Sequence, residues 1–393
     1  MVTQRHPECS HFTLGGLDLP DMTRTDVILI GAGPIGLEMA VALRDAGISY
    51  RHIEGQQVGS TIGWFPRQAR FFSSPERIAI CGVPLVNEDQ SKATRETYLA
   101  YLHGIVQQFQ LPIQTYERVT QITARPAVGD AATATARFQV DTVRTDGPHT
   151  YEADRIILAI GDMHRPRRLR DPQGHALDYD ELPHVTHYFE EPHPYVGQRL
   201  LIVGGRNSAA EAAIRCHRAG ARVGMSYRRD QLEGSIKYWL KPELEWLIRT
   251  GDIAFYPQTV PVRIDATHVT LAPVADAKTL MPSATDWRSI PADFVLLMVG
   301  YEMDSSLLRT AGVQLHGAQQ APVVNGDTME TNVPGLYIAG TAAAGTQLNF
   351  RLFIENCHMH VVRIMRHLAG CEPRHISPLA YRCLHEQVPL AES

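Results

Sequence analysis

Two glycine-rich turns, each placed between an apolar strand and a helix, constrain the fold of this chain more than any other feature. The first, GAGPIG, follows the apolar run 27–30 and has Gly31, Gly33 and Gly36 at the GxGxxG spacing, with Pro34 at the start of the helix. In this spacing the first glycine makes the tight turn, the second admits a pyrophosphate, and the third lets the helix pack on the strand. Free N–H groups and the positive dipole at the helix start then favour phosphate. The pattern predicts a dinucleotide-binding unit.

The next strand of this unit ends in an acid. The segment ISYRHIE ends at Glu54, which stands 23 residues after Gly31. A carboxylate at this position can accept hydrogen bonds from a ribose. GxGxxG alone is a weak signal, so the order of strand, loop, helix, strand and acid supports the nucleotide site.

The same pattern returns after the apolar run 200–203, in the sequence GGRNSA. Arg206 stands where the second glycine usually lies, so this copy is degenerate. Asn and Ser at a helix start are favourable capping residues. The residues expected to bind the second nucleotide are Gly204, Gly205, Asn207, Ser208 and Ala209.

The strand after this second loop ends in Tyr227, Arg228 and Arg229 in place of an acid. An arginine at such a strand end can bind the 2′-phosphate of a nicotinamide dinucleotide. We therefore expect Arg228 and Arg229 to favour NADPH over NADH. The alternative is a charged turn exposed to solvent.

Two dinucleotide sites in one chain suggest one bound flavin, FAD, and one diffusing nicotinamide cofactor, NADPH. The strands 155–162 and 293–301 end near glycine and look like the two crossings between domains of such flavoproteins. The late strand in GLYIAGTAAAG (335–345) is expected to bring its turn to the flavin, with Thr341 where Asp is usual. The further FAD contacts expected are Gly161, Gly340, Thr341 and the backbone of Val119.

These elements predict an α/β fold with two Rossmann-like dinucleotide-binding domains. The FAD domain is discontinuous and is expected over 22–190 and 300–393, with an NADPH domain of 195–295 inserted into it. A length of 393 residues suits two domains, since single cores rarely exceed about 250–300 residues.

Composition narrows the range of functions. The net charge is −5 with 20% charged residues and no basic stripe, which argues against nucleic acid. No apolar run reaches the ~18 residues of a membrane span. The first 25 residues lack the pattern of a signal peptide, so a cytoplasmic location is expected. The six cysteines form no CxxC pair and no zinc spacing, so we expect no metal site.

From Asp26 to His367 the chain resembles the YpdA-type flavoproteins, bacillithiol-disulfide reductases related to thioredoxin reductase. The segments that carry the resemblance are ARFFSSPERIAICGVPL, HYFEEPHPY, GGRNSAAEAA, SIKYWLKPELE and LFIEN followed by His360. The resemblance implies hydride transfer from NADPH to the flavin, reduction of a low-molecular-weight disulfide, and a homo-oligomer. It also implies that Lys237, within SIKYWLKPELE, holds the nicotinamide nucleotide or an anionic substrate.

The thiol chemistry departs from this family. Disulfide reduction normally uses a cysteine beside the flavin, and YpdA-type proteins carry one directly after the proline of the first glycine loop, where this chain has Ile35. Cys81 and Cys357 are candidate substitutes, with a structural role as the alternative for each. His360 is a candidate either for proton delivery to the reduced flavin or for a structural role.

Two other functions stay open. The segment 184–211 resembles the approach to the NADPH site of flavin-containing monooxygenases, with His184 and Tyr188 at matching positions but without the upstream FxG. Such an enzyme acts through a flavin hydroperoxide and needs no cysteine. A ferredoxin- or flavodoxin-type reductase is the third possibility, for which the basic segment 165–170 would suit an acidic protein. The acceptor is therefore a small molecule or a small protein.

Overall fold

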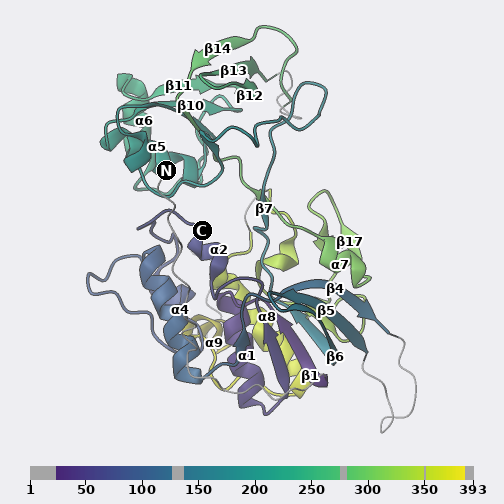
Figure 1. Ribbon diagram of the computed structural model, residues 1–393. Helices are drawn as coiled ribbons and strands as arrows, with labels where there is room; N and C mark the ends of the chain where they lie inside the picture. The colour runs from purple at the N-terminus through teal and green to yellow at the C-terminus, as the bar shows by residue number, and fades with distance from the viewer. Residues whose placement is uncertain (1–23, 126–136, 275–280, 349–350, 386–393) are drawn as a thin grey trace, which may run out of the picture.

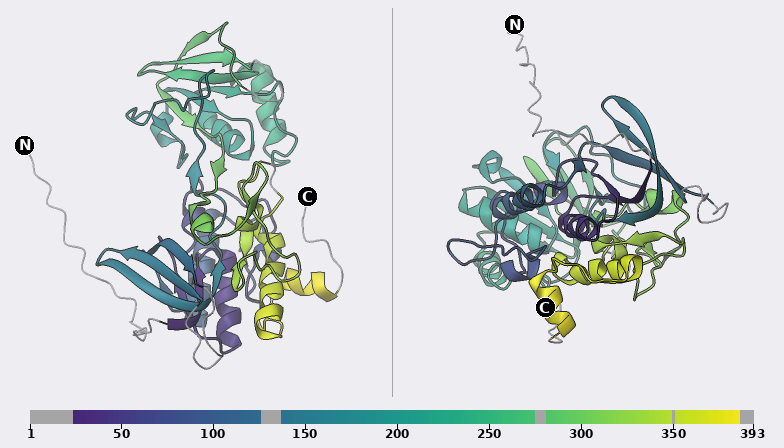
Figure 2. Two further views of the ribbon diagram at one scale, coloured as in Figure 1. Left: turned by 90° about the vertical axis from the view of Figure 1, so that its right-hand side faces the viewer. Right: turned by 90° about the horizontal axis from the view of Figure 1, so that it is seen from below.

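The computed structural model describes residues 24–125, 137–274, 281–348 and 351–385. It shows two α/β lobes stacked one above the other and joined by two extended segments (Figure 1; Figure 2, left). The lower lobe contains both ends of the described chain, and the upper lobe is built from its middle.

The lower lobe is built on a seven-stranded sheet. β1 lies in its middle, parallel to β2 on one side and to β6 on the other, so that Val27 stands opposite Tyr50 and Arg155. The strand order is β3 (Ile113–Gln114), β2 (Tyr50–Ile53), β1 (Arg24–Ile30), β6 (Gly147–Leu158), β5 (Phe138–Arg144) and β4 (Arg118–Ala124), with β19 (Leu336–Ile338) parallel to β6. Because β1 is covered on both faces, its residues 27–30 are all apolar and buried.

Helices cover this sheet. α1 (Pro34–Asp45) is buried continuously over residues 35–43, and it packs against α8 (Ile354–Ala369). The other helices of the lobe are α2 (Ser60–Gly63), α3 (Pro75–Ile78), α4 (Arg95–Phe109), α7 (Ser306–Thr310), α9 (Pro378–His385) and the 3-10 turn η2 (Gly340–Ala344). The short strands β17 (Leu315–His316) and β18 (Ala321–Pro322) form a hairpin in the same lobe.

A buried ion pair joins α1 to α8. His358 Nδ1 lies 2.7 Å from Glu38 Oε2, and its Nε2 donates to the carbonyl of Arg77 at 2.9 Å. Burial opposes protonation of this imidazole, but the carboxylate and the carbonyl outweigh it, and the pKa of His358 is raised. With both ring nitrogens facing acceptors, the protonated form fits this site.

The upper lobe has a parallel five-stranded sheet. Its order is β11 (Ala254–Pro257), β10 (Arg222–Tyr227), β9 (Arg199–Val203), β15 (Phe294–Leu297) and β8 (Val185–Thr186). The remaining elements are α5 (Asn207–Arg218), α6 (Lys241–Thr250), the 3-10 turn η1 (His193–Tyr195) and an antiparallel sheet of β12 (Thr259–Ile264), β13 (His268–Pro273) and β14 (Arg288–Pro291).

Two antiparallel segments connect the lobes. β7 (Arg165–Pro166) runs upward and pairs with β16 (Tyr301–Glu302), which returns. The predicted α/β class with two Rossmann-like units is confirmed. The predicted domain boundaries, 22–190 and 300–393 for FAD and 195–295 for NADPH, stay predictions. In the structure the upper sheet begins before position 190, because β8 pairs with β15. Among the described residues, no helix combines the length and hydropathy that a bilayer crossing requires.

Candidate functional site

The first glycine loop, between β1 and α1, is shaped by close backbone approaches. Gly31 has φ +103°, and a Cβ on it would lie 2.5 Å from the carbonyl oxygen of Ala159. A Cβ on Gly36 would lie 2.0 Å from the carbonyl oxygen of Gly31. A Cβ on Gly33 would meet no described atom within 4 Å. The protein itself requires the first and third glycines, whereas the second faces open space beside the start of α1, where Pro34 is the first helical residue. This arrangement fits the pyrophosphate of FAD.

Glu54 is fixed at the end of β2 by the backbone around it. Its Oε2 accepts from Ala32 N at 2.7 Å, and its Oε1 accepts from Gln56 N at 2.9 Å. The neighbouring His52 is fully buried and donates from Nε2 to the carbonyl of Gly31 at 2.9 Å. Desolvation lowers the pKa of His52 to about 4, so a neutral imidazole supports the loop. Glu54 is thus held beside the glycine loop, as a ribose-binding acid requires.

Other predicted FAD residues lie on neighbouring strands. Val119 lies in β4 next to a register shift between Val119 and Gln121, where the strand departs from regular pairing with β5. Gly161 has φ +73°, and a Cβ on it would lie 3.8 Å from the hydroxyl oxygen of Thr341. The turn η2 begins at Gly340, whose φ is +77° and which packs against the side chain of Ile35. The fold therefore brings Gly161, Gly340 and Thr341 together. They lie at the carboxyl ends of the parallel strands β6 and β19, where the first loop also follows β1.

Asp162 and Gln347 belong to this cluster, and the sequence interpretation missed both. The Asp162 carboxylate is hydrogen-bonded to the side chains of Thr341 and Gln347, the latter at 3.0 Å. Desolvation raises the pKa of Asp162. A carboxylate therefore lies beside Thr341, and it comes from the segment between β6 and β7. The available signal was its position immediately after Gly161.

The second glycine loop shares with the first a leading glycine at positive φ that lies against a backbone carbonyl. Gly204 has φ +145°, and a Cβ on it would lie 2.5 Å from the carbonyl oxygen of Met298 and 3.2 Å from the Cβ of Ala209. A Cβ on Gly205 would lie 2.5 Å from the ring of Tyr227. Here both leading glycines are required by close packing, and the loop rests on an aromatic ring.

The start of α5 is tied to the segment that follows β10. Asn207 accepts from the backbone N–H of Lys237 at 2.7 Å and donates to the carbonyl of Ser235 at 3.3 Å, while Ser208 is exposed in the first turn. Arg228 and Arg229 are exposed at the end of β10. The residues predicted for NADPH therefore lie around one loop, which fits a nucleotide at the N-terminus of α5.

Lys237 connects the two lobes. Its side chain is largely buried, and its ammonium donates to the carbonyl of Arg70 at 2.7 Å and pairs with Glu211 at 3.4 Å. In this arrangement both contacts are made within the protein. The predicted contact of Lys237 with nucleotide or substrate stays a prediction.

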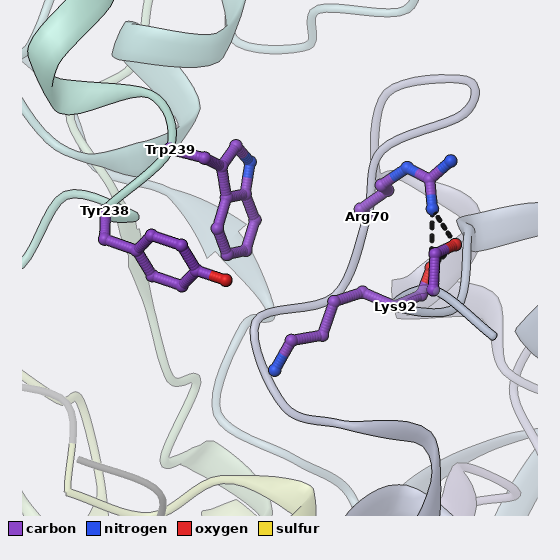
Figure 3. A pocket seen from close by; sticks show the side chains of 5 residues that line it. Arg70, Lys92, Tyr238 and Trp239 are labelled. Carbon is purple, nitrogen blue, oxygen red and sulfur yellow. Dashed lines mark hydrogen bonds between the residues drawn. The ribbon is translucent and has the colours of Figure 1, made fainter.

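A cavity of about 200 Å³ lies beside Lys237, between the lobes (Figure 3). The lower lobe contributes the cationic side chains of Arg70 and Lys92, at the right of Figure 3, and the upper lobe contributes the rings of Tyr238 and Trp239, at the left. The lining residues are Arg70, Ser91, Lys92, Tyr238 and Trp239. Trp239 also stacks on Phe72 of the lower lobe, with ring centroids 6.2 Å apart.

Comparison with known proteins places this geometry in a family. The model for pyridine nucleotide-disulphide oxidoreductases matches residues 28–340, which span both glycine loops. The chain belongs to this family. Like its other members, it is an FAD- and NAD(P)H-dependent oxidoreductase.

Three relatives of this oxidoreductase align with it over nearly their whole length. Bacilliredoxin reductase Bdr of Bacillus subtilis (strain 168) is 33% identical over 351 residues, covering 89% of this chain and 99% of the relative. The solved structure of bacillithiol disulfide reductase Bdr (YpdA) from Bacillus cereus has a TM-score of 0.78 and 33% identity, covering 88% of this chain and 99% of that one. The Staphylococcus aureus structure of the same name has a TM-score of 0.76 and 30% identity, covering 89% and 99%. The resemblance to YpdA-type flavoproteins is confirmed.

The candidate thiols of this oxidoreductase lie in the protein interior. Cys357, in the first turns of α8, is fully buried, and desolvation raises the pKa of its thiol. Cys81 is also fully buried at φ +55°, and desolvation raises its pKa well above the usual value. A reactive thiol generally needs exposure and a lowered pKa. The redox roles of Cys81 and Cys357 stay predictions. Ile35, at the position of the family's cysteine, is a buried core residue.

His360 supports the turn at Gly340. Its Nδ1 accepts from the backbone N–H of Gly340 at 3.2 Å, and desolvation lowers its pKa to about 4. A neutral imidazole in this contact positions the turn. His184 and Tyr188, considered for a monooxygenase, make other contacts: His184 donates to the carbonyl of Asp265 at 3.1 Å, and Tyr188 packs edge-on to Trp64.

Proposed function

We propose that the chain is an NADPH-dependent disulfide reductase whose acceptor is a low-molecular-weight disulfide. One observation carries the proposal: relatives named bacilliredoxin or bacillithiol disulfide reductase align with this chain over 99% of their length at about one third identity. In the reaction, NADPH and one proton reduce one disulfide to two thiols, and NADP⁺ is released. Bacillithiol disulfide, named in the titles of the two solved relatives, is the first acceptor to test.

The chain's own residues divide the binding tasks. We assign the FAD pyrophosphate to the loop at Gly31 and Gly33, and its ribose to Glu54. The second loop and the arginines after β10 hold the NADPH phosphates. FAD, when bound, supplies the two-electron chemistry between nicotinamide and disulfide. The neutral His360 holds the backbone of Gly340, and the Asp162–Gln347 pair keeps the following segment in place.

The thiol relay is the open part of the proposal. With Ile35 at the family's cysteine position, and with Cys81 and Cys357 buried, we infer that neither cysteine is required for turnover. The monooxygenase alternative also needs no cysteine, and it predicts a different product. The ferredoxin-type alternative predicts a protein acceptor. The strong match to the disulfide reductases favours the first interpretation.

The test is a balance of reactants and products. The purified yellow protein is supplied with NADPH under anaerobic conditions, and each candidate disulfide is added in turn. Two thiols for each NADPH consumed support the proposal, whereas NADPH consumption only on admission of oxygen supports a monooxygenase or an oxidase. A homo-oligomer and a cytoplasmic location belong to the same proposal; light scattering on the eluting protein tests the first, and localisation of a tagged protein in cells the second.

A further inference from the structure

A single carboxylate lies inside the arginine cluster of the second nucleotide site. Glu233 Oε1 accepts from the hydroxyl of Tyr227 at 2.8 Å, lies 3.1 Å from Arg229 Nε and stands 4.0 Å from Arg206 Nε. All three groups converge on the same oxygen. The Glu233 side chain is only about one fifth exposed, at 21%, so these contacts hold it in place.

This carboxylate lies at the nucleotide loop itself. The ring of Tyr227 is the surface against which Gly205 packs, and Glu233 N donates to the carbonyl of Gly205 at 3.4 Å. The glycine loop, the end of β10 and Glu233 thus meet at one place. Burial and the neighbouring carboxylate raise the pKa of Tyr227 to about 12, so its hydroxyl keeps the proton that it donates.

The surrounding charge is strongly positive. Arg228 reaches the surface, yet enough protein surrounds its guanidinium that desolvation lowers its pKa, and the charges of Arg206 and Arg229 lower it further. Arg167, from the crossing segment, has a pKa that is lowered by desolvation and then by Arg228 and Arg206. Because these cations repel one another, an anion bound among them stabilises the charged forms of the arginines. Glu233 already supplies one negative charge there.

We infer that Glu233 is a specificity-determining residue, whose carboxylate occupies the place where Arg229 would bind the 2′-phosphate of NADPH. Phosphate and carboxylate compete for the same guanidinium, and they repel each other as like charges. NADH has a 2′-hydroxyl instead, which can donate to a carboxylate. Glu233 therefore reduces the preference for NADPH that the arginines create. The inference rests on the proposed nicotinamide site and not on the identity of the disulfide.

The rival role for Glu233 is purely structural, and it predicts the opposite sign. If the carboxylate only orders Arg229 and Tyr227 for phosphate binding, its removal weakens NADPH. If it competes with the phosphate, its removal strengthens NADPH and leaves NADH unchanged or weaker. Two like charges about 6 Å apart, in a partly screened surface site, change affinity by about threefold to tenfold.

The experiment is a calorimetric titration of the oxidised FAD-loaded protein with NADP⁺ and with NAD⁺, at one ionic strength. The variants are Glu233→Gln and Glu233→Ala, and Asp230→Asn, exposed in the same loop, is the control for loss of a negative charge. FAD content and thermal unfolding are measured for each variant, to check that it is folded.

We expect Glu233→Gln and Glu233→Ala to bind NADP⁺ about threefold to tenfold more tightly, with NAD⁺ unchanged or weaker and Asp230→Asn close to the parent. Weaker NADP⁺ binding by both Glu233 variants would overturn the inference, as would an equal gain from Asp230→Asn. Binding is measured without any acceptor, so failure of the disulfide assignment would leave this result intact. Failure of the parent to bind either nucleotide would remove the inference together with the nicotinamide site.

Discussion

Alanine substitutions at Gly36 and Gly33 should separate what the first loop does for the fold from what it does for FAD. A Cβ at Gly36 would lie 2.0 Å from the carbonyl oxygen of Gly31, whereas ordinary contact begins at 3.4 Å. The obstacle is backbone, so the cost lies at the upper end of overpacking, about 3 kcal/mol. Alanine in a helix offsets about 1 kcal/mol of this. We expect Gly36→Ala to lower the free energy of unfolding of the apoprotein by about 2 kcal/mol.

Gly33→Ala is the matched variant. A Cβ there meets no described atom within 4 Å, and the φ of −76° suits any residue. The poorer helix cap costs about 1 kcal/mol, and the lower entropy of the unfolded chain offsets about 0.4–1 kcal/mol. Apoprotein stability should therefore change by less than about 1 kcal/mol, while FAD binding falls because the methyl group occupies the pyrophosphate's approach.

Denaturant unfolding of the apoproteins and fluorescence titration with FAD measure the two effects separately. The reasoning is refuted if the Gly33→Ala protein binds FAD as tightly as the parent. It is equally refuted if the Gly36→Ala apoprotein is as stable as the parent, because the fold would then not require a glycine at position 36.

Three further outcomes follow from the structure. Replacing Arg228 and Arg229 together by alanine should weaken NADPH binding by at least about tenfold more than NADH binding; equal losses in paired titrations would contradict the 2′-phosphate assignment. Cys357→Ala should keep the disulfide-dependent rate of NADPH oxidation while losing about 1 kcal/mol of stability, and loss of turnover in a folded, FAD-loaded protein would restore the thiol relay. The stability advantage of the parent over Glu38→Gln should be full below pH 6.5 and decline as pH rises through the raised pKa of His358; a difference in thermal unfolding that grows with pH would contradict the charged pair.

The nucleotide loops could be predicted from the sequence because their physical requirements are local. Gly31 and Gly204 adopt positive φ in the tight turn, and Gly36 approaches the backbone of Gly31, so these requirements arise within one strand–turn–helix unit of recognisable spacing. Glu54 could be placed for the same reason, since it ends the strand beside the loop.

The contacts between distant segments could not be predicted in this way. Asp162 meets Gln347 across 185 residues of sequence, and Lys237 reaches Arg70 across 167. Nothing in either local pattern specifies the partner, because the contact depends on how β7, β16 and the two lobes pack. The burial of Cys357 was equally hidden, since it depends on α1 covering that face of α8.

The most direct test of the central claim is anaerobic, rapid mixing of the NADPH-reduced protein with bacillithiol disulfide, beside a parallel mixing with oxygen. The account predicts that the disulfide restores the oxidised flavin spectrum quickly and yields two thiols per flavin, and that the Cys357→Ala protein does the same. A flavin that stays reduced with every disulfide tested, and is reoxidised only by oxygen or by an electron-carrier protein, would contradict the disulfide reductase assignment.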